Sequence, residues 1–146
     1  MVAMVVMIDD NPQDADLIKM AFAHNERPIR FHHAVDGLQG VKLLTELLSA
    51  AGDDLPRLII IDVNMPRIRG PEVLAFIKNC PRLLNVPVVM LSSSDAPKER
   101  ALCLALGATR YLVKPLRLED IYLCVAEIAL YLDDPAAPLA APLVDI

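Results

Sequence analysis

The sequence predicts an α/β domain in which a parallel sheet is covered by helices on both faces, the doubly wound class. Five short apolar runs alternate with five longer segments of helical character along the 146 residues. Alternation of this kind is typical of parallel sheets built from strand–helix–strand units. The apolar content of 55% agrees with this class, because strands buried on both faces are rich in Val, Ile and Leu. The chain length suits one domain.

The predicted strands are short apolar segments, and their composition indicates their place in the sheet. They lie, in chain order, at residues 2–8, 29–35, 58–61, 86–91 and 109–113. The first, third and fourth contain almost no polar side chain, which indicates burial on both faces. The second contains His32 and His33 and alternates more strongly, so we predict that it lies at an edge of the sheet.

The predicted helices follow the strands and carry start and stop signals. The first begins at Pro12, directly after the potential N-cap Asn11. The others are expected at about residues 37–50, 71–80, 97–106 and 118–132, and Gly107 is expected to end the fourth in a left-handed conformation. The fifth has the most regular apolar stripe, formed by Leu118, Ile121, Val125, Ile128 and Leu132.

Composition excludes several classes of protein. A net charge of −5 argues against nucleic acid or an anionic membrane as the main partner. No uncharged apolar run reaches the roughly 18 residues of a transmembrane helix, and the first residues lack the basic start of a signal peptide. Cys80, Cys103 and Cys124 show no metal-binding spacing, so we expect reduced thiols and a cytoplasmic location.

The chain is expected to divide into a domain and a tail. Residues 1–132 contain all the predicted strands and helices. Residues 133–146 are rich in Pro and Ala and form a predicted extended C-terminal tail.

Polar side chains follow four of the five predicted strands. In chain order they are Asp9, Asp10, Asp62, Asn64, Ser92 and Lys114. Because the carboxyl ends of parallel strands meet at one edge of a sheet, we expect these side chains to converge there. Three carboxylates repel one another unless a cation lies between them, and oxygen ligands of this kind suit Mg²⁺. Lys114 and Ser92 would complement an anion beside that metal, such as a phosphoryl group on an aspartate.

Four sequence motifs resemble the receiver domain of two-component response regulators. They are IDDNP, IIIDVNMPRIRG, VVMLSSS and GATRYLVKP, and they occur in the order and strand context of that family over residues 1–132. The resemblance implies a flavodoxin-like sheet of five parallel strands in the order 2-1-3-4-5, with five helices. The segments NPQDADL and CPRLLNVPVV, with Tyr131, further resemble single-domain regulators associated with phytochrome-type histidine kinases.

The resemblance implies a role for each matched residue. Asp62 would be the phosphoacceptor, and Lys114 and Ser92 would contact the phosphoryl group. The implied Mg²⁺ ligands are Asp9, Asp10, Asp62 and the backbone carbonyl of Asn64, and the implied switch residues are Ser92 and Tyr111. A cis peptide is expected before Pro115. Arg69 departs from the pattern, because the family commonly has an acidic residue before this glycine.

The implied function is that of a phosphoacceptor signalling protein rather than an enzyme. It would accept a phosphoryl group from a histidine kinase in a Mg²⁺-dependent phosphorelay and then lose it by autodephosphorylation. The implied partners are a histidine kinase, phytochrome-type included, or a histidine phosphotransfer protein, with no nucleic acid and no membrane. Output would pass through protein contacts or onward phosphotransfer. Surplus apolar residues on the fourth and fifth helices indicate an interface, and the resemblance implies a homodimer through these helices and the fifth strand. The alternative is that these residues pack on the tail, including Leu139 and Leu143.

Other classes of protein fit parts of the pattern. Phosphatases and mutases of the haloacid dehalogenase type also form a phospho-aspartate, but they place an Asp-x-Asp pair after their first strand. Here the third strand is followed by Asp62, Val63 and Asn64. A pseudo-receiver, a binding module without phosphorylation, typically lacks the acidic pair or the lysine, and this chain retains both. Dinucleotide binding is disfavoured because no GxGxxG follows the first strand.

Overall fold

The computed structural model describes residues 2–50 and 52–137, and its fold is the doubly wound α/β class predicted from the sequence. In this part of the chain, parallel strands form one sheet in the order β2-β1-β3-β4-β5. The strands are β1 (Ala3–Ile8), β2 (Ile29–Ala34), β3 (Leu58–Asp62), β4 (Val88–Ser92) and β5 (Arg110–Val113). The implied flavodoxin-like order is therefore confirmed, and β2 lies at an edge as predicted.

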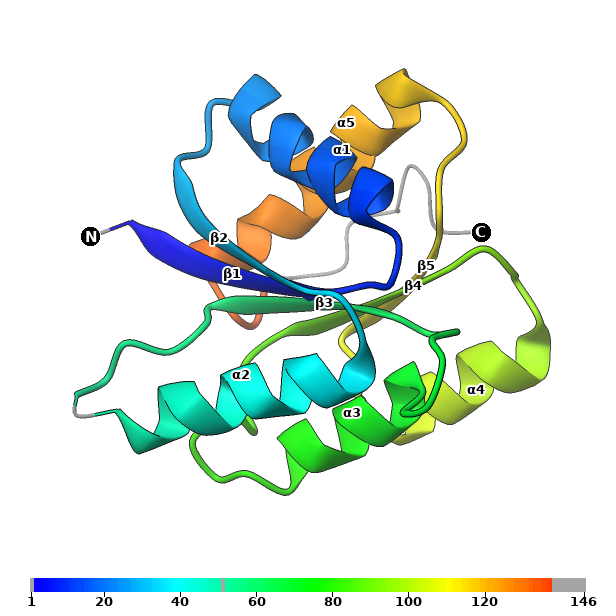
Figure 1. Cartoon of the computed structure of the whole chain (residues 1–146). Coiled ribbons are helices and arrows are strands. Elements are labelled where there is room, and N and C mark those ends of the chain that lie inside the picture. Colours follow the sequence, from blue (N-terminus) through cyan, green and yellow to red (C-terminus); the bar gives the residue numbers. More distant parts are fainter. Residues whose placement is uncertain (1, 51, 138–146) are drawn as a thin grey trace.

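The helices cover the sheet in two layers. Figure 1 shows α1 and α5 on one face and α2, α3 and α4 on the other. Their bounds are α1 (Pro12–His24), α2 (Gly37–Ser49), α3 (Gly70–Lys78), α4 (Pro97–Ala105) and α5 (Leu118–Ile128). The last predicted helix does not continue as an α-helix to residue 132, because its final turn tightens into the 3₁₀ helix η1 (Ala129–Leu132). Such tightening is frequent at the C-terminal ends of helices.

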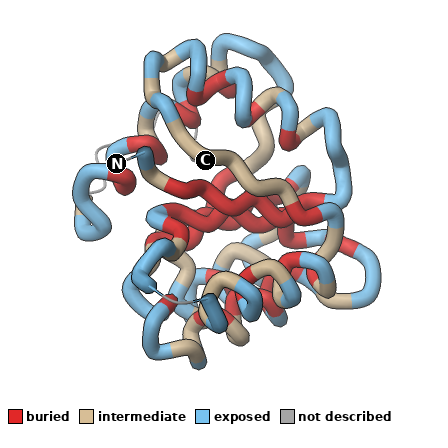
Figure 2. Tube along the Cα trace, turned by 60° about the vertical axis from the view of Figure 1, so that its left-hand side comes forward, coloured by how far each residue is buried: buried red, intermediate tan, exposed pale blue. Residues whose placement is uncertain are grey.

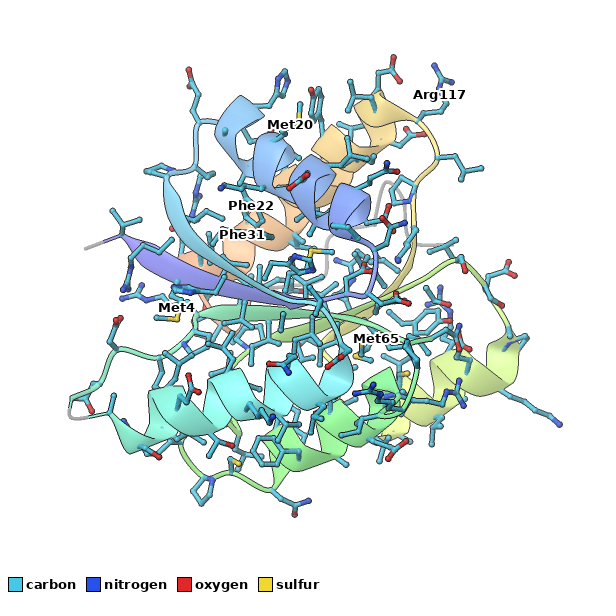
Figure 3. The ribbon with its side chains drawn as sticks, in the orientation of Figure 1. Met4, Met20, Phe22, Phe31, Met65 and Arg117 are labelled. Atoms are coloured by element: carbon cyan, nitrogen blue, oxygen red, sulfur yellow. The ribbon has the colours of Figure 1, made fainter. Side chains whose placement is uncertain are left out.

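Each face of the sheet contributes to its own apolar core. Strands β1, β3, β4 and β5 are almost wholly buried in Figure 2, whereas the edge strand β2 is mostly half-buried. Phe22 of α1 and Phe31 of β2 belong to the core between the sheet and α1 and α5, whereas Met4 belongs to the opposite core under α2, α3 and α4. Figure 3 shows the two phenylalanines together on the α1 side of the sheet. Burial on both faces explains the unbroken apolar runs of β1, β3 and β4.

Local signals predicted from the sequence fix where two of the helices begin and end. Asn11 caps α1, where its side chain accepts hydrogen bonds from the backbone N–H of Gln13 at 2.9 Å and of Asp14 at 3.4 Å. Gly107 follows α4 with a φ of 103°, the left-handed conformation predicted for it. The Asn11 cap fixes the loop from β1 to α1 at the carboxyl edge of the sheet, whereas Gly107 lies in the connection from α4 to β5, before β5 begins.

The cysteines and the tail agree only in part with the predictions. Cys103 and Cys124 are buried free thiols, and Cys80 is half-buried just after α3. Residues 138–146 lie outside the described residues, so the extended tail remains a prediction. Among the described residues, no helix combines the length and the apolar character that crossing a membrane requires.

Candidate functional site

The carboxyl edge of the sheet lies to the right in Figure 1. An open cleft is formed at this edge by the residues that follow the strands. Its volume is about 520 Å³, and its lining residues are Asp10, Asn11, Pro12, Asp14, Asp62, Asn64, Ser93 and Lys114. β1 pairs with β2 on one side and β3 on the other, so the chain reverses its direction of winding here. Crevices at such reversal points are the usual ligand sites of open α/β sheets.

Three carboxylates converge in the cleft as the sequence predicted. One oxygen from each of Asp9, Asp10 and Asp62 lies within 4.8 Å of the others. Asp9 is fully buried, Asp62 is 5% exposed and Asp10 is exposed. Burial raises the pKa of Asp62 to about 7; Lys114 opposes the shift, and the Asp9 charge adds to it. Burial also raises the pKa of Asp9. The cluster therefore stores electrostatic repulsion that a cation would relieve.

Lys114 supplies the positive charge of the cleft. Its Nζ lies 3.0 Å from Asp9 Oδ2, 2.9 Å from Asp14 Oδ2 and 3.6 Å from Asp62 Oδ1. Burial alone would lower the pKa of Lys114, but its carboxylate partners outweigh burial and raise it. Asp14, an acidic residue in the first turn of α1, is not among the site residues predicted from the sequence. The structure brings it into the site, because the first turn of α1 lies against the end of β5.

The backbone around Asp62 is held by two close contacts. Asn64 N–H donates to Asp62 Oδ1 at 3.3 Å, and Gly70 N–H donates to the carbonyl of Val63 at 3.0 Å. A Cβ on Gly70 would lie 2.5 Å from the carbonyl oxygen of Asp62, so α3 begins against the end of β3 only because residue 70 has no side chain.

Asp9 is held from three sides. Its Oδ1 accepts the backbone N–H of Asn11 at 2.8 Å, and its Oδ2 accepts from Lys114. Its backbone carbonyl lies 2.7 Å from Nε2 of His33 on the edge strand β2. His33 therefore has a structural contact here, between the edge strand and the residue that follows β1.

Ser92 and Tyr111 share an acceptor that the sequence did not indicate. The Ser92 hydroxyl donates to Glu99 Oε1 at 2.6 Å. The buried Tyr111 hydroxyl bonds the same carboxylate oxygen and lies 2.8 Å from the Ser94 carbonyl. Burial and Glu99 together raise the pKa of Tyr111 to about 12. Burial would raise the pKa of Glu99, but the hydrogen bonds that it accepts lower it overall.

Arg69 links two loops beside the cleft. Its Nη2 donates to Asn64 Oδ1 at 2.9 Å and lies 3.9 Å from Glu99 Oε2. Arg69, which replaces the acidic residue common at this position in the family, thus pairs with Glu99. A carboxylate at position 69 would instead repel Glu99. No cis peptide bond occurs in the described part of the chain, so the cis bond expected before Pro115 is absent.

The predicted site residues are therefore assembled at one edge of the sheet. Asp9, Asp10, Asp62, Asn64 and Lys114 border the cleft or its acidic cluster. Ser92 and Tyr111 lie beside it, with their hydroxyls directed to Glu99. Sequence reasoning missed Asp14, Glu99 and the bridging role of Arg69; Asp14 and Glu99 each lie in the first turn of a helix that begins at this edge.

The fold and the cleft define a flavodoxin-like α/β protein with an acidic site at its strand reversal. The chain belongs to the family of response regulator receiver domains, whose family model matches residues 5–126. It is therefore a response regulator receiver of the two-component type, as the four motifs implied.

Curated relatives agree with this assignment. Over 127 residues the chain is 33% identical to "Probable methanogenesis regulatory protein FilR2" of Methanothrix harundinacea, covering 87% of this chain and 81% of that protein. It is 28% identical over 121 residues to two-component response regulator ORR1 of Oryza sativa, covering 82% of this chain. The chain spans about half of ORR1, 52% of its length.

Solved structures of response regulators, one of them a phytochrome response regulator, have the same fold. The phosphorylated cyanobacterial phytochrome response regulator RcpA superposes with a TM-score of 0.81 at 29% identity, over 94% of this chain and 98% of RcpA. The Mn²⁺-bound form of response regulator Rcp1 gives a TM-score of 0.77 at 27% identity, over 95% of this chain and 99% of Rcp1. The similarity to a phytochrome response regulator, first seen in short sequence segments, extends over 94% of this chain.

Proposed function

We propose that this receiver accepts a phosphoryl group on Asp62 from a phosphohistidine of a histidine kinase or phosphotransfer protein. The observation that carries the proposal is a recessed carboxylate that reaches the cleft beside a lysine 3.6 Å away. In the transfer, an Asp62 oxygen forms a bond to phosphorus as the P–N bond breaks. The electron pair of that bond passes to the imidazole nitrogen, which takes up a proton. Lys114 neutralises charge on the phosphoryl oxygens.

The donor set fits Mg²⁺ as the resident cofactor. Asp9, Asp10 and Asp62 offer carboxylate oxygens within 4.8 Å of one another, and the loop after β3 adds the Asn64 carbonyl. The metal would neutralise charge on the phosphoryl group during transfer. Support also comes from Rcp1, whose structure was determined in a Mn²⁺-bound form.

Labelling with a small phosphodonor tests the proposal. Incubation with acetyl phosphate and Mg²⁺ should give an acid-stable, base-labile acyl phosphate, seen as a mass increase, and Asp62→Asn should lose most of it. Asp95→Asn, an exposed aspartate beside the same cleft loop, is the matched control and should label like wild type. Equal labelling of Asp62→Asn and wild type would remove Asp62 from the central role.

The proposed partner is a histidine kinase of the phytochrome type, supported by the similarity to RcpA. We expect no turnover of a separate substrate, only self-phosphorylation and autodephosphorylation, and a cytoplasmic location. Phosphotransfer profiling against purified histidine kinases identifies the cognate donor. A kinase that labels wild type but not Asp62→Asn supports the assignment, and a receiver that no phosphorylated kinase labels would contradict it.

We further propose a homodimer through α4, β5 and α5. Exposed leucines lie on α4 (Leu102), in the loop after β5 (Leu116) and on α5 (Leu123). The predicted apolar surplus is smaller than the sequence indicated, because Cys124 is buried in the core and Tyr122 stacks on His24 of α1 with ring centroids 3.8 Å apart. The leucines that remain exposed support the interface.

A further inference from the structure

The hydroxyl of Ser92 is already engaged in the structure. It has one proton, and it donates that proton to Glu99 Oε1 at 2.6 Å. As an acceptor, its oxygen receives the backbone N–H of Ser94 at 3.1 Å. Ser92 is fully buried, so water does not offer it an alternative partner. A phosphoryl group on Asp62 that needs this proton must therefore compete with Glu99 for it.

Tyr111 is engaged by the same carboxylate. Its ring is 1% exposed, and its hydroxyl meets Glu99 Oε1 and the carbonyl of Ser94. One oxygen of Glu99 thus connects the end of β4, the middle of β5 and the first turn of α4. If the Ser92 hydroxyl changes its acceptor, the Glu99 carboxylate that also binds Tyr111 loses one of its hydrogen-bond donors.

Glu99 is itself held in place by a cation. Arg69 Nη2 lies 3.9 Å from Glu99 Oε2 and donates to the Asn64 side chain at 2.9 Å. The Glu99 side chain is only 16% exposed, whereas Arg69 is 53% exposed and reaches it from the loop before α3. Arg69 therefore supplies the counter-charge that a largely buried carboxylate requires.

We propose that Glu99 is a positioning residue that withholds the Ser92 hydroxyl from Asp62 until phosphorylation, so that charging of Asp62 exchanges the Ser92 hydrogen bond from Glu99 to the phosphoryl group. This inference rests on the proposed phosphorylation of Asp62. The exchange releases Glu99 from one of its two hydroxyl donors and so changes the attachment of α4 to the sheet. In the unphosphorylated state, Glu99 is then an acceptor that competes with the phosphoryl group for the Ser92 hydroxyl.

The test measures binding of beryllium trifluoride, a phosphoryl mimic, to the full chain in Mg²⁺ by calorimetric titration and fluorine NMR. Glu99→Ala removes the competitor, so the mimic should bind roughly tenfold more tightly than to wild type, the scale of one charge-assisted hydrogen bond. Glu99→Gln retains a neutral acceptor of the same shape and should show a smaller gain. If Glu99→Ala does not fold, the affinity of Glu99→Gln alone tests the proposal.

Two further variants separate the proposed exchange from other effects. Asp95→Asn removes one negative charge from the same loop, and it should leave the affinity unchanged. In a Ser92→Ala background, Glu99→Ala should give no further gain, because a purely structural effect of residue 99 would persist there while an effect through Ser92 would vanish. The inference would be overturned if Asp95→Asn increased the affinity for the mimic as much as Glu99→Ala does. It would also be overturned if Glu99→Ala increased the affinity fully in the Ser92→Ala background.

Failure of this inference is distinguishable from failure of the proposed function. Wild type that binds the mimic, with Asp62→Asn that does not, establishes the acceptor. Unchanged or weaker binding by Glu99→Ala and Glu99→Gln in that situation overturns only the role of Glu99. Binding that is equally absent, or equally present, in wild type and Asp62→Asn overturns the acceptor and the role of Glu99 together.

Discussion

Burial in the folded state changes the protonation of Asp62. Burial raises its pKa from 3.8 to about 7, so the folded state binds a proton that the unfolded chain has already released. The free energy of unfolding of the metal-free protein therefore falls as the pH rises from about 4 to about 7. Mg²⁺ binds the deprotonated cluster and releases those protons, so its stabilising effect grows over the same interval.

We expect the increase in melting temperature caused by millimolar Mg²⁺ to be larger at pH 8 than at pH 5.5. Thermal unfolding at the two pH values, with and without the metal, measures this directly. In Asp10→Ala, which removes an exposed carboxylate of the cluster, the shift should be strongly reduced at both. A metal-induced shift of the same size at both pH values in wild type would contradict the pKa assigned to Asp62.

Lys114 and a bound metal ion would compete for the same carboxylates, Asp9 and Asp62. Its Nζ lies 3.0 Å from an Asp9 oxygen and 3.6 Å from an Asp62 oxygen, so it competes with a cation for these carboxylates. Lys114→Ala should therefore bind Mg²⁺ roughly tenfold more tightly, since one unit charge near a partly buried site contributes a kilocalorie or more. It should nevertheless label poorly with acetyl phosphate. Calorimetric Mg²⁺ titration checks the first effect, and weaker binding by the variant would contradict it.

At the scale of elements, the junction of β3 with α3 depends on one small residue. A Cβ at Gly70 would lie 2.5 Å from the Asp62 carbonyl oxygen and 2.8 Å from Val63 Cα. Gly70→Ala should thus push α3 away from the end of β3 and destabilise the protein by about 1–3 kcal/mol, the usual cost of overpacking. Urea unfolding measures the change. Gly52→Ala gives a comparison in which nothing lies within 4 Å of the added carbon, so its loss of stability comes only from the strain that a φ of 102° places on an alanine. Unchanged stability in Gly70→Ala would argue against the close contact.

Periodicity predicted the elements because each strand and helix carries its own signal. The buried strands β1, β3 and β4 were visible as apolar runs, and the edge strand was visible through His32 and His33. The carboxyl-edge rule then placed Asp9, Asp62 and Lys114 together without any side-chain geometry. The strand order itself came from the family resemblance, since periodicity does not distinguish one parallel order from another.

The details that sequence did not predict are contacts between side chains of different elements. Glu99 in the first turn of α4 reads as a favourable helix-start charge, and so does Asp14 in α1. Which hydroxyl or ammonium each one reaches depends on how the helix is rotated against the sheet. That rotation is set by packing of the whole core. The tightening of the last turn into η1 has the same origin, because apolar spacing alone does not distinguish α from 3₁₀ geometry at a helix end.

At the scale of the whole molecule, assembly follows from what the core leaves uncovered. Leu116, in the loop after β5, is 99% exposed, and Leu123 on α5 is 43% exposed. Sedimentation at micromolar concentration should show a dimer, and Leu116→Asp with Leu123→Asp should shift it to a folded monomer, with a lower melting temperature only to the extent that dimerisation stabilises the folded state. Met20→Asp, an exposed apolar residue on α1 (Figure 3), is the control and should leave the dimer intact. A wild-type monomer, with and without beryllium trifluoride, would contradict the interface.

The order of the strands in the sheet has a consequence for the time at which the site comes into being. The cleft draws Asp9 from β1, Asp62 from β3 and Lys114 from the end of β5, and the pair of Asp9 and Lys114 spans 105 positions of the chain. During synthesis the acceptor leaves the ribosome well before the lysine that neutralises it. A nascent chain that ends before β5 carries the acidic cluster but lacks its counter-charge and the strand that bears Tyr111. We expect that such a chain is not phosphorylated by its phosphodonor, so that only chains synthesised past Lys114 accept the phosphoryl group.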